Sequence, residues 1–80
     1  MYELRGTANN VIDRLKDYIV EMIEEFKNGY IGDISTYKKM LDVIKMLNND
    51  VGSEDEVDIQ VSGDWCYIAV KRDNGEFQCL

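Results

Sequence analysis

The chain contains no histidine and no proline among its 80 residues, and it carries few cations. Without histidine it lacks the usual general base, the commonest metal ligand and the side chain that changes charge near neutral pH. Nine lysines and arginines stand against sixteen aspartates and glutamates, which gives a formal net charge of −7. Because phosphates and anionic lipids attract cations, this balance opposes direct binding to nucleic acid or to a membrane surface. It favours a basic protein partner instead.

Long apolar runs are also missing. No run approaches the roughly 20 residues needed to cross a membrane, and residues 1–6 lack the charged-then-apolar pattern of a signal peptide. We therefore expect a cytoplasmic protein. An apolar content of 45% is typical of a globular chain rather than a disordered one. The length predicts a single domain over residues 1–80 with a small core.

Motifs that carry chemistry are absent as well. The sequence has no Ser/His/Asp set, no glycine-rich phosphate loop and no cluster with metal-ligand spacing. The acidic segment 50–58 has carboxylates that calcium could use, but it does not match the twelve-residue calcium loop. We expect a protein that is not an enzyme and that has no catalytic residues, no cofactor and no metal.

An amphipathic helix is predicted over residues 7–28. Thr7, Asn9 and Asn10 are candidate N-caps, and Gly29 occupies the position at which a left-handed residue commonly follows a helix. At about 100° per residue, the apolar side chains share one stripe. The stripe consists of Val11, Ile12, Leu15, Tyr18, Ile19, Met22, Ile23 and Phe26.

A second helix is predicted from the N-cap Asp33 to about residue 48. Its apolar stripe consists of Ile34, Tyr37, Met40, Leu41, Ile44 and Leu47. Its opposite side carries Lys38, Lys39, Asp42 and Lys45. Because the connection over 29–33 is short, the two helices are expected to lie antiparallel and adjacent.

Three strands are predicted over residues 57–62, 65–72 and 76–80. A two-residue turn at Gly63-Asp64 pairs Val57 with Val70, Ile59 with Ile68 and Val61 with Cys66. A two-residue turn at Asn74-Gly75 pairs Val70 with Cys79 and Arg72 with Phe77. This register places Val57, Ile59, Val61, Cys66, Ile68, Val70, Phe77 and Cys79 on one face. Residues 1–5 are either a further short strand, with Tyr2 and Leu4 on one face, or a loose terminal arm.

Together these elements predict an α+β fold. An antiparallel helical hairpin packs on one face of a three-stranded antiparallel β-meander, in the order α-α-β-β-β with an optional short N-terminal strand. In this arrangement the two cysteines are both buried, and they lie roughly 13 Å apart, which is beyond disulfide reach. Two cysteines without histidine do not make a structural zinc site.

The other face of the predicted sheet carries the only tryptophan. That face consists of Asp58, Gln60, Ser62, Trp65, Tyr67, Ala69, Lys71, Gln78 and Leu80. Exposed aromatic side chains on a sheet can anchor a protein partner or a second copy, or stack on bases, which the net charge opposes. The alternative is that residues 1–5 or a bend of the chain cover Trp65.

Acidic residues form a stripe along the first helix, opposite its apolar stripe. Asp13, Asp17, Glu21 and Glu24 follow one another about 4–6 Å apart along the helix axis. Like charges at this spacing cost a few tenths of a kcal/mol per pair. Their spacing resembles that of phosphates, about 3.4 Å apart along one DNA strand. The stripe is either a contact surface that imitates nucleic acid or an ordinary solvated helix face.

A second acidic region lies between the second helix and the first predicted strand. Asp50, Glu54, Asp55, Glu56 and Asp58 occur with no cation between Lys45 and Lys71. This segment is either an acidic contact patch or a solvated loop.

The outer faces of the two predicted helices carry opposite charges, since the second helix is basic outside and the first is acidic outside. This difference also favours self-association, although exposed ion pairs contribute only about 0–1 kcal/mol each.

These features lead to two hypotheses. The first is a non-enzymatic acidic inhibitor or adaptor that engages the basic surface of a nucleic-acid-binding protein by charge mimicry. Its expected partner-binding residues are Asp13, Asp17, Glu21, Glu24, Glu54, Asp55, Glu56, Trp65 and Tyr67. In size and charge the chain resembles small acidic phage and mobile-element inhibitors, such as anti-CRISPR and anti-restriction proteins, although no motif carries the resemblance. The alternative is a structural protein that forms a homodimer or scaffold through the outer sheet face or the edge strand 76–80.

Overall fold

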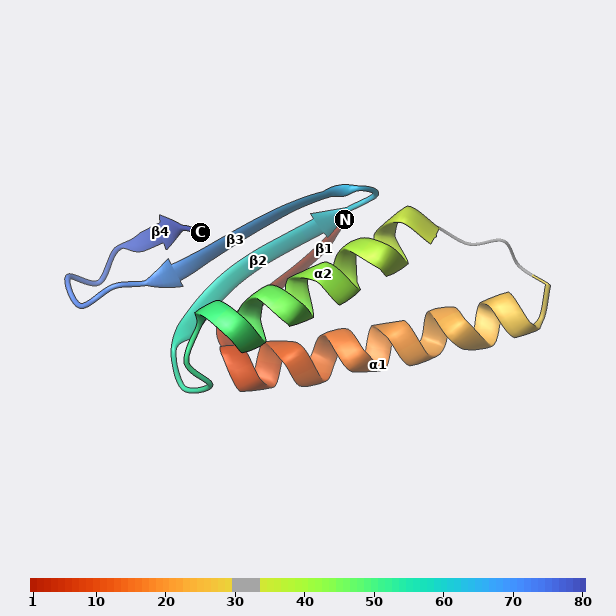
Figure 1. The fold of residues 1–80 in the computed structure, drawn as a ribbon, viewed down its shortest axis with the longest axis horizontal. Coiled ribbons are helices and arrows are strands. Elements are labelled where there is room, and N and C mark those ends of the chain that lie inside the picture. The colour runs from red at the N-terminus through yellow and green to blue at the C-terminus, as the bar shows by residue number, and fades with distance from the viewer. Residues whose placement is uncertain (30–33) are drawn as a thin grey trace.

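The computed structural model describes residues 1–29 and 34–80. Six elements follow one another: β1 (Tyr2–Thr7), α1 (Ala8–Lys27), α2 (Ile34–Asp50), β2 (Glu56–Ser62), β3 (Trp65–Lys71) and β4 (Phe77–Cys79). The described strands form one antiparallel sheet in the order β1-β2-β3-β4. The two helices contact one face of this sheet (Figure 1). The predicted α+β class and the helical hairpin on a meander are therefore confirmed.

The N-terminal residues form a full strand, so the alternative of a loose arm is wrong. β1 pairs with β2 in antiparallel register, with Tyr2 opposite Val61 and Leu4 opposite Ile59. Leu4 is buried in the core, and the Tyr2 ring packs on that of Tyr18 from α1, with 4.8 Å between centroids. β1 thus occupies the edge of β2 that would otherwise present unpaired backbone groups.

Both predicted ends of α1 are confirmed. The Thr7 hydroxyl accepts a hydrogen bond from the backbone N–H of Asn10 at 3.2 Å, as an N-cap should. At the other end Gly29 has a φ of 87°, and its N–H donates to the carbonyl of Phe26. The predicted N-cap of α2, Asp33, lies outside the described residues.

The core lies between the helices and the sheet. It consists of Leu4, Ala8, Val11, Ile12, Leu15, Ile19, Met22, Met40, Val43, Leu47, Val57, Ile59, Val61, Ile68 and Val70. Ile23, Ile34 and Leu41 are exposed, although the helical pattern predicts them as buried. They lie at the margins of their stripes, on the side of the helices that faces away from the sheet. Their positions are therefore left uncovered.

The predicted β2–β3 hairpin is confirmed in its register, with Ile59 opposite Ile68. Gly63 has a φ of 57°, while no other residue of its turn has a positive φ, which is the pattern of a type II′ turn with glycine first. The Gly63 N–H donates to the hydroxyl of Thr36 on α2 at 3.0 Å. This bond ties the start of α2 to the turn between β2 and β3.

Replacing Thr36 by valine is expected to lower the free energy of unfolding by about 1–3 kcal/mol, because the partly buried Gly63 N–H loses its acceptor. Thr36 itself is buried, so water does not readily replace the hydroxyl. Urea denaturation measures the loss, and Thr36→Ser, which keeps the hydroxyl, should recover most of it. A Thr36→Val protein as stable as the wild type would contradict a stabilising role for this bond.

The β3–β4 hairpin differs from the prediction by one residue. Its loop contains three residues, 73–75, because the Arg72 N–H donates to the Glu76 carbonyl and the Gly75 N–H donates to the Arg72 carbonyl, both at 2.8 Å. Only Gly75 has a positive φ, 84°, whereas the predicted type I′ turn needs one at Asn74 too. The Asn74 side chain instead accepts a hydrogen bond from the Glu76 N–H.

This shift exchanges the two faces of β4. Val70 lies opposite Gln78, not Cys79, and Lys71 lies opposite Phe77. Phe77 and Cys79 therefore lie on the face away from the helices, and Gln78 and Leu80 on the helix side, in contrast to the prediction. On the outer face the Arg5 guanidinium lies 4.5 Å from the centroid of the Phe77 ring.

The cysteines consequently lie in different environments. Cys66 is half-buried and packs against the core, whereas Cys79 is exposed, so the expectation of two buried cysteines is wrong for Cys79. Neither forms a disulfide. A thiol reagent should modify Cys79 in the native protein much faster than Cys66, and Cys79→Ser should abolish the fast phase. Two slow phases, or two equally fast ones, would contradict this arrangement.

Candidate partner-binding surfaces

The acidic stripe lies on the exposed side of α1. Asp13, Asp17, Glu21 and Glu24 are all exposed, while Leu15 on the opposite side is fully buried. At 1.5 Å per residue the stripe is about 16 Å long. The packing of the opposite side holds α1 against the sheet and the second helix, so the carboxylates project from a fixed support.

Most of these carboxylates form no ion pair with a described residue. Glu24 forms an ion pair with Lys27, with 3.8 Å between the charged atoms, and both side chains are well exposed. Within residues 1–29 and 34–80, no ion pair involves Asp13, Asp17 or Glu21. Since exposed pairs at this distance contribute little, the field of the whole stripe remains available to a partner.

The loop before β2 contacts the N-terminal end of α1 through its backbone. The carbonyls of Asp55 and Ser53 accept hydrogen bonds from the N–H groups of Ala8 and Asn9, at 2.8 and 3.0 Å. These bonds satisfy donors that the first turn of a helix leaves free. Glu54 and Asp55 are both exposed. The structure therefore places the backbone of this loop at the start of α1, whereas the Asp55 carboxylate accepts a hydrogen bond from the Gly52 N–H and lines a hollow with Lys71 and Arg72.

The remaining predicted residues belong to a different surface. Glu56 lies on the outer face of the sheet, where its carboxylate is 3.3 Å from the Lys71 ammonium, in a cross-strand pair. Trp65 and Tyr67 share that face, and Trp65 is 49% exposed. Since the helices pack on the other face, these residues point away from the acidic stripe. The nine predicted partner-binding residues thus form two separate surfaces.

Tyr67 has a neighbour that the sequence did not reveal. A hydrogen bond with the Cys79 side chain is the main cause that raises the pKa of the Tyr67 hydroxyl, with smaller contributions from burial and from the charges of Cys79 and Asp58. The phenol therefore stays neutral. Only the true register of β4 brings Cys79 to this face, so the one-residue error in the predicted turn hid the contact.

Other parts of the described surface offer no defined chemistry. An open hollow beside the β3–β4 hairpin is lined by Asp55, Lys71, Arg72, Asp73 and Asn74, which carry both signs of charge. Among the described residues, no three His, Cys, Asp or Glu side chains are grouped to hold a metal ion. No described helix combines the length and apolar character that a membrane span requires.

Comparison with known proteins adds no further evidence. The chain matches no protein-family model, no curated protein and no solved structure. Function must therefore be inferred from the two surfaces described above.

Proposed function

We propose that this protein is a non-enzymatic protein-binding module, an inhibitor or adaptor, whose acidic α1 surface engages the basic surface of a nucleic-acid-binding protein. The observation that carries the proposal is the exposed line of Asp13, Asp17 and Glu21, none of which has an ion-pair partner in the described chain. Glu54 and Asp55 add two exposed acidic residues in the loop that contacts the start of the helix.

The geometry fits a surface that normally contacts phosphates. The rise along the helix axis from one charge to the next is about 4–6 Å, which is comparable to the rise of about 3.4 Å per phosphate along a DNA strand. A packed helix holds them in place, so a partner does not have to order them. Long-range attraction would speed the encounter, while the desolvated contacts formed afterwards would supply most of the affinity. The size and charge of the chain agree with a phage or mobile-element inhibitor of host nucleic-acid enzymes.

The outer sheet face supports a second candidate, a structural protein that self-associates. The exposed Trp65 favours a contact there, and β4 is a three-residue edge strand. Much of the face is already covered by its own side chains, however: Ala69 is fully buried and Arg5 lies over the Phe77 ring. The acidic α1 surface therefore remains the better supported contact.

A tagged pull-down from a lysate of the source organism or its host tests the proposal. We expect one basic nucleic-acid-handling protein to be recovered at low salt and to be weakened at moderately high salt, as read by mass spectrometry. The salt effect follows from the screening of exposed charges. Recovery of the chain alone, or of a partner that salt does not affect, would contradict the proposal.

A further inference from the structure

An aliphatic strip crosses the solvent side of the helical hairpin. Val20 and Ile23 on α1 are 58% and 36% exposed, and Leu41 on α2 is 44% exposed. Ile34, at the start of α2, is exposed as well. Aliphatic side chains are stabilised by leaving water, so such a strip is a candidate contact surface. We call these four residues the helix-face strip.

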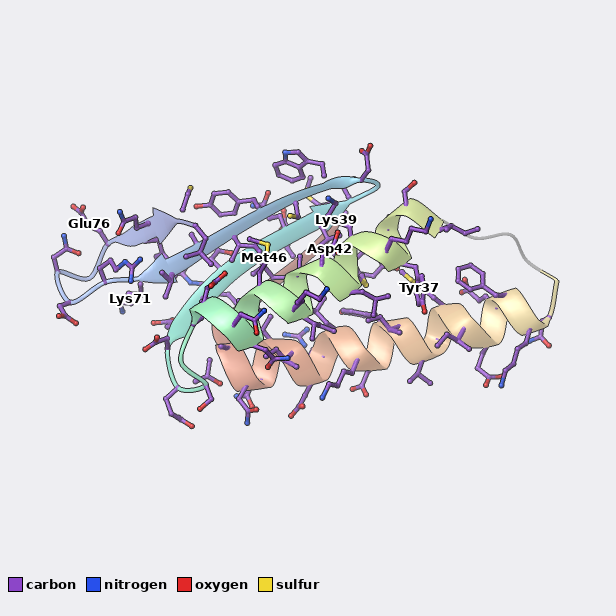
Figure 2. All side chains as sticks on the ribbon, in the orientation of Figure 1. Tyr37, Lys39, Asp42, Met46, Lys71 and Glu76 are labelled. Atoms are coloured by element: carbon purple, nitrogen blue, oxygen red, sulfur yellow. The ribbon has the colours of Figure 1, made fainter. Side chains whose placement is uncertain are left out.

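The contact between the helices sets which positions of α1 and α2 lie side by side. The rings of Phe26 and Tyr37 meet edge to face at 5.7 Å, and Figure 2 shows Tyr37 between α2 and α1. In an antiparallel pair, each step back along α1 is matched by a step forward along α2. Ile23 is therefore level with residues 40–41. Helical periodicity turns both Ile23 and Leu41 to the side of the groove that faces away from the sheet.

Opposite charges border the strip on its two sides. On α1, beyond Val20, lie the carboxylates of the acidic stripe, with the exposed Lys16 and Lys27 on the near side of Val20, whereas on α2, beyond Ile34, lie the exposed Lys38 and Lys45, with Asp42 beside them. The same matching of positions sets Lys45 level with residues 18–19, between Asp17 and Glu21. The other cation on α2, Lys39, turns towards the sheet and pairs with Asp42 at 3.9 Å (Figure 2).

We propose that a second copy of this chain covers the helix-face strip. A two-fold axis parallel to the helices places α1 of one copy over α2 of the other, so the acidic side meets the basic side twice and the aliphatic side chains meet in the centre. Lys45 of each copy then lies opposite Asp17 and Glu21 of the other, and Lys38 lies opposite Glu24. A two-fold axis across the helices would instead place acid on acid.

The charge pattern favours a second copy over an unrelated partner. A surface that is acidic on one side, apolar in the middle and basic on the other is complementary to itself under a single two-fold rotation. Exposed ion pairs alone would not hold such a dimer, because each contributes little. Burial of the strip supplies the remaining stabilisation.

This inference does not depend on the proposed function. It involves no other protein, and its test contains only the purified chain. If both contacts exist, they exclude each other, because each uses the carboxylates of α1. Self-association would then limit the amount of chain that is free to bind a basic partner.

Sedimentation velocity from low micromolar to millimolar concentration tests the dimer. We expect a monomer–dimer equilibrium that salt weakens. Leu41→Lys should abolish the dimer, whereas Trp65→Lys, which changes an exposed apolar residue on the outer sheet face, should leave it intact. A wild-type chain that stays monomeric at the highest concentration would overturn the proposal, as would a dimer that only Trp65→Lys disrupts.

A charge exchange tests the orientation of the two copies. Lys45→Glu and Glu21→Lys should each raise the dissociation constant several-fold, and the chain that carries both should recover most of the wild-type value, because the pair is restored with reversed sign. Circular dichroism checks that each variant is folded. Additive losses in the double variant would overturn the proposed arrangement.

Discussion

Reversing two charges of the acidic stripe, by Asp17→Lys together with Glu21→Lys, is expected to lower the association rate with a basic partner by roughly tenfold or more, because like charges then face each other during the encounter. The affinity of the variant for the partner should fall together with the association rate. Surface plasmon resonance with the captured partner measures both quantities. An unchanged association rate would show that the stripe is not the contact surface.

This variant should remain folded, so a loss of binding cannot be attributed to unfolding. The new lysines would stand one turn from Asp13 and from Glu25, at spacings where opposite charges stabilise a helix by about 0.2–0.5 kcal/mol per pair, and these two pairs outweigh the like-charge pair that the lysines form with each other. In the wild type the same positions carry like charges. Asp73→Lys with Glu76→Lys is the matched control: it changes net charge equally but lies on the exposed β3–β4 hairpin, where Figure 2 places Glu76. The control should bind as the wild type does.

Ile59→Ala is expected to cost about 2–5 kcal/mol of the free energy of unfolding, since it leaves a cavity in the centre of the core. Ile59 is fully buried on β2, where it lies between Leu4 on β1 and Ile68 on β3. A small domain is stable by only about 5–15 kcal/mol, so the loss would be a large part of the total. Chemical denaturation measures it.

Ile59→Val provides a graded comparison at the same position. Removing one methyl group should cost about 0.5–1.5 kcal/mol, well below the alanine value. If both variants lost less than the valine estimate, β2 would not be the centre of the core. It would also mean that the core does not hold α1 and its carboxylates in place.

The sequence predicted those parts of the fold that depend on local patterns. Alternating Val57, Ile59 and Val61, with glycine at a two-residue turn, determined both the buried face of β2 and its pairing with β3. The start of α1 followed from a threonine that could act as an N-cap. In each case one side chain or one turn decides the outcome, so sequence reasoning was sufficient.

Where a segment could adopt more than one local conformation, the sequence did not show which one forms. Asp73-Asn74-Gly75 can form a two-residue or a three-residue loop, and the structure uses glycine alone for the positive φ. That choice moved Phe77 and Cys79 to the other face. The exposure of Ile23 and Leu41 depends on which side of each helix the sheet and the other helix cover, which periodicity does not encode.

The candidate surfaces were predicted in part for the same reason. Helical periodicity was enough to gather the carboxylates of α1 on one side. The position of Glu54 and Asp55 in a loop at the start of α1 depends on hydrogen bonds between residues far apart in the chain, which the sequence does not reveal. The separation of Trp65 from the stripe likewise required knowing that the helices cover the opposite face of the sheet.

Competition with nucleic acid is the most direct test of the proposal that the α1 carboxylates stand in for phosphates. The basic partner recovered in the pull-down would be loaded with a labelled duplex, and the chain would be titrated in while the anisotropy of the label is followed. We expect the wild type to displace the duplex, and the Asp17→Lys/Glu21→Lys variant to fail to displace it. A ternary complex, in which the chain and the duplex bind the partner together, would contradict charge mimicry.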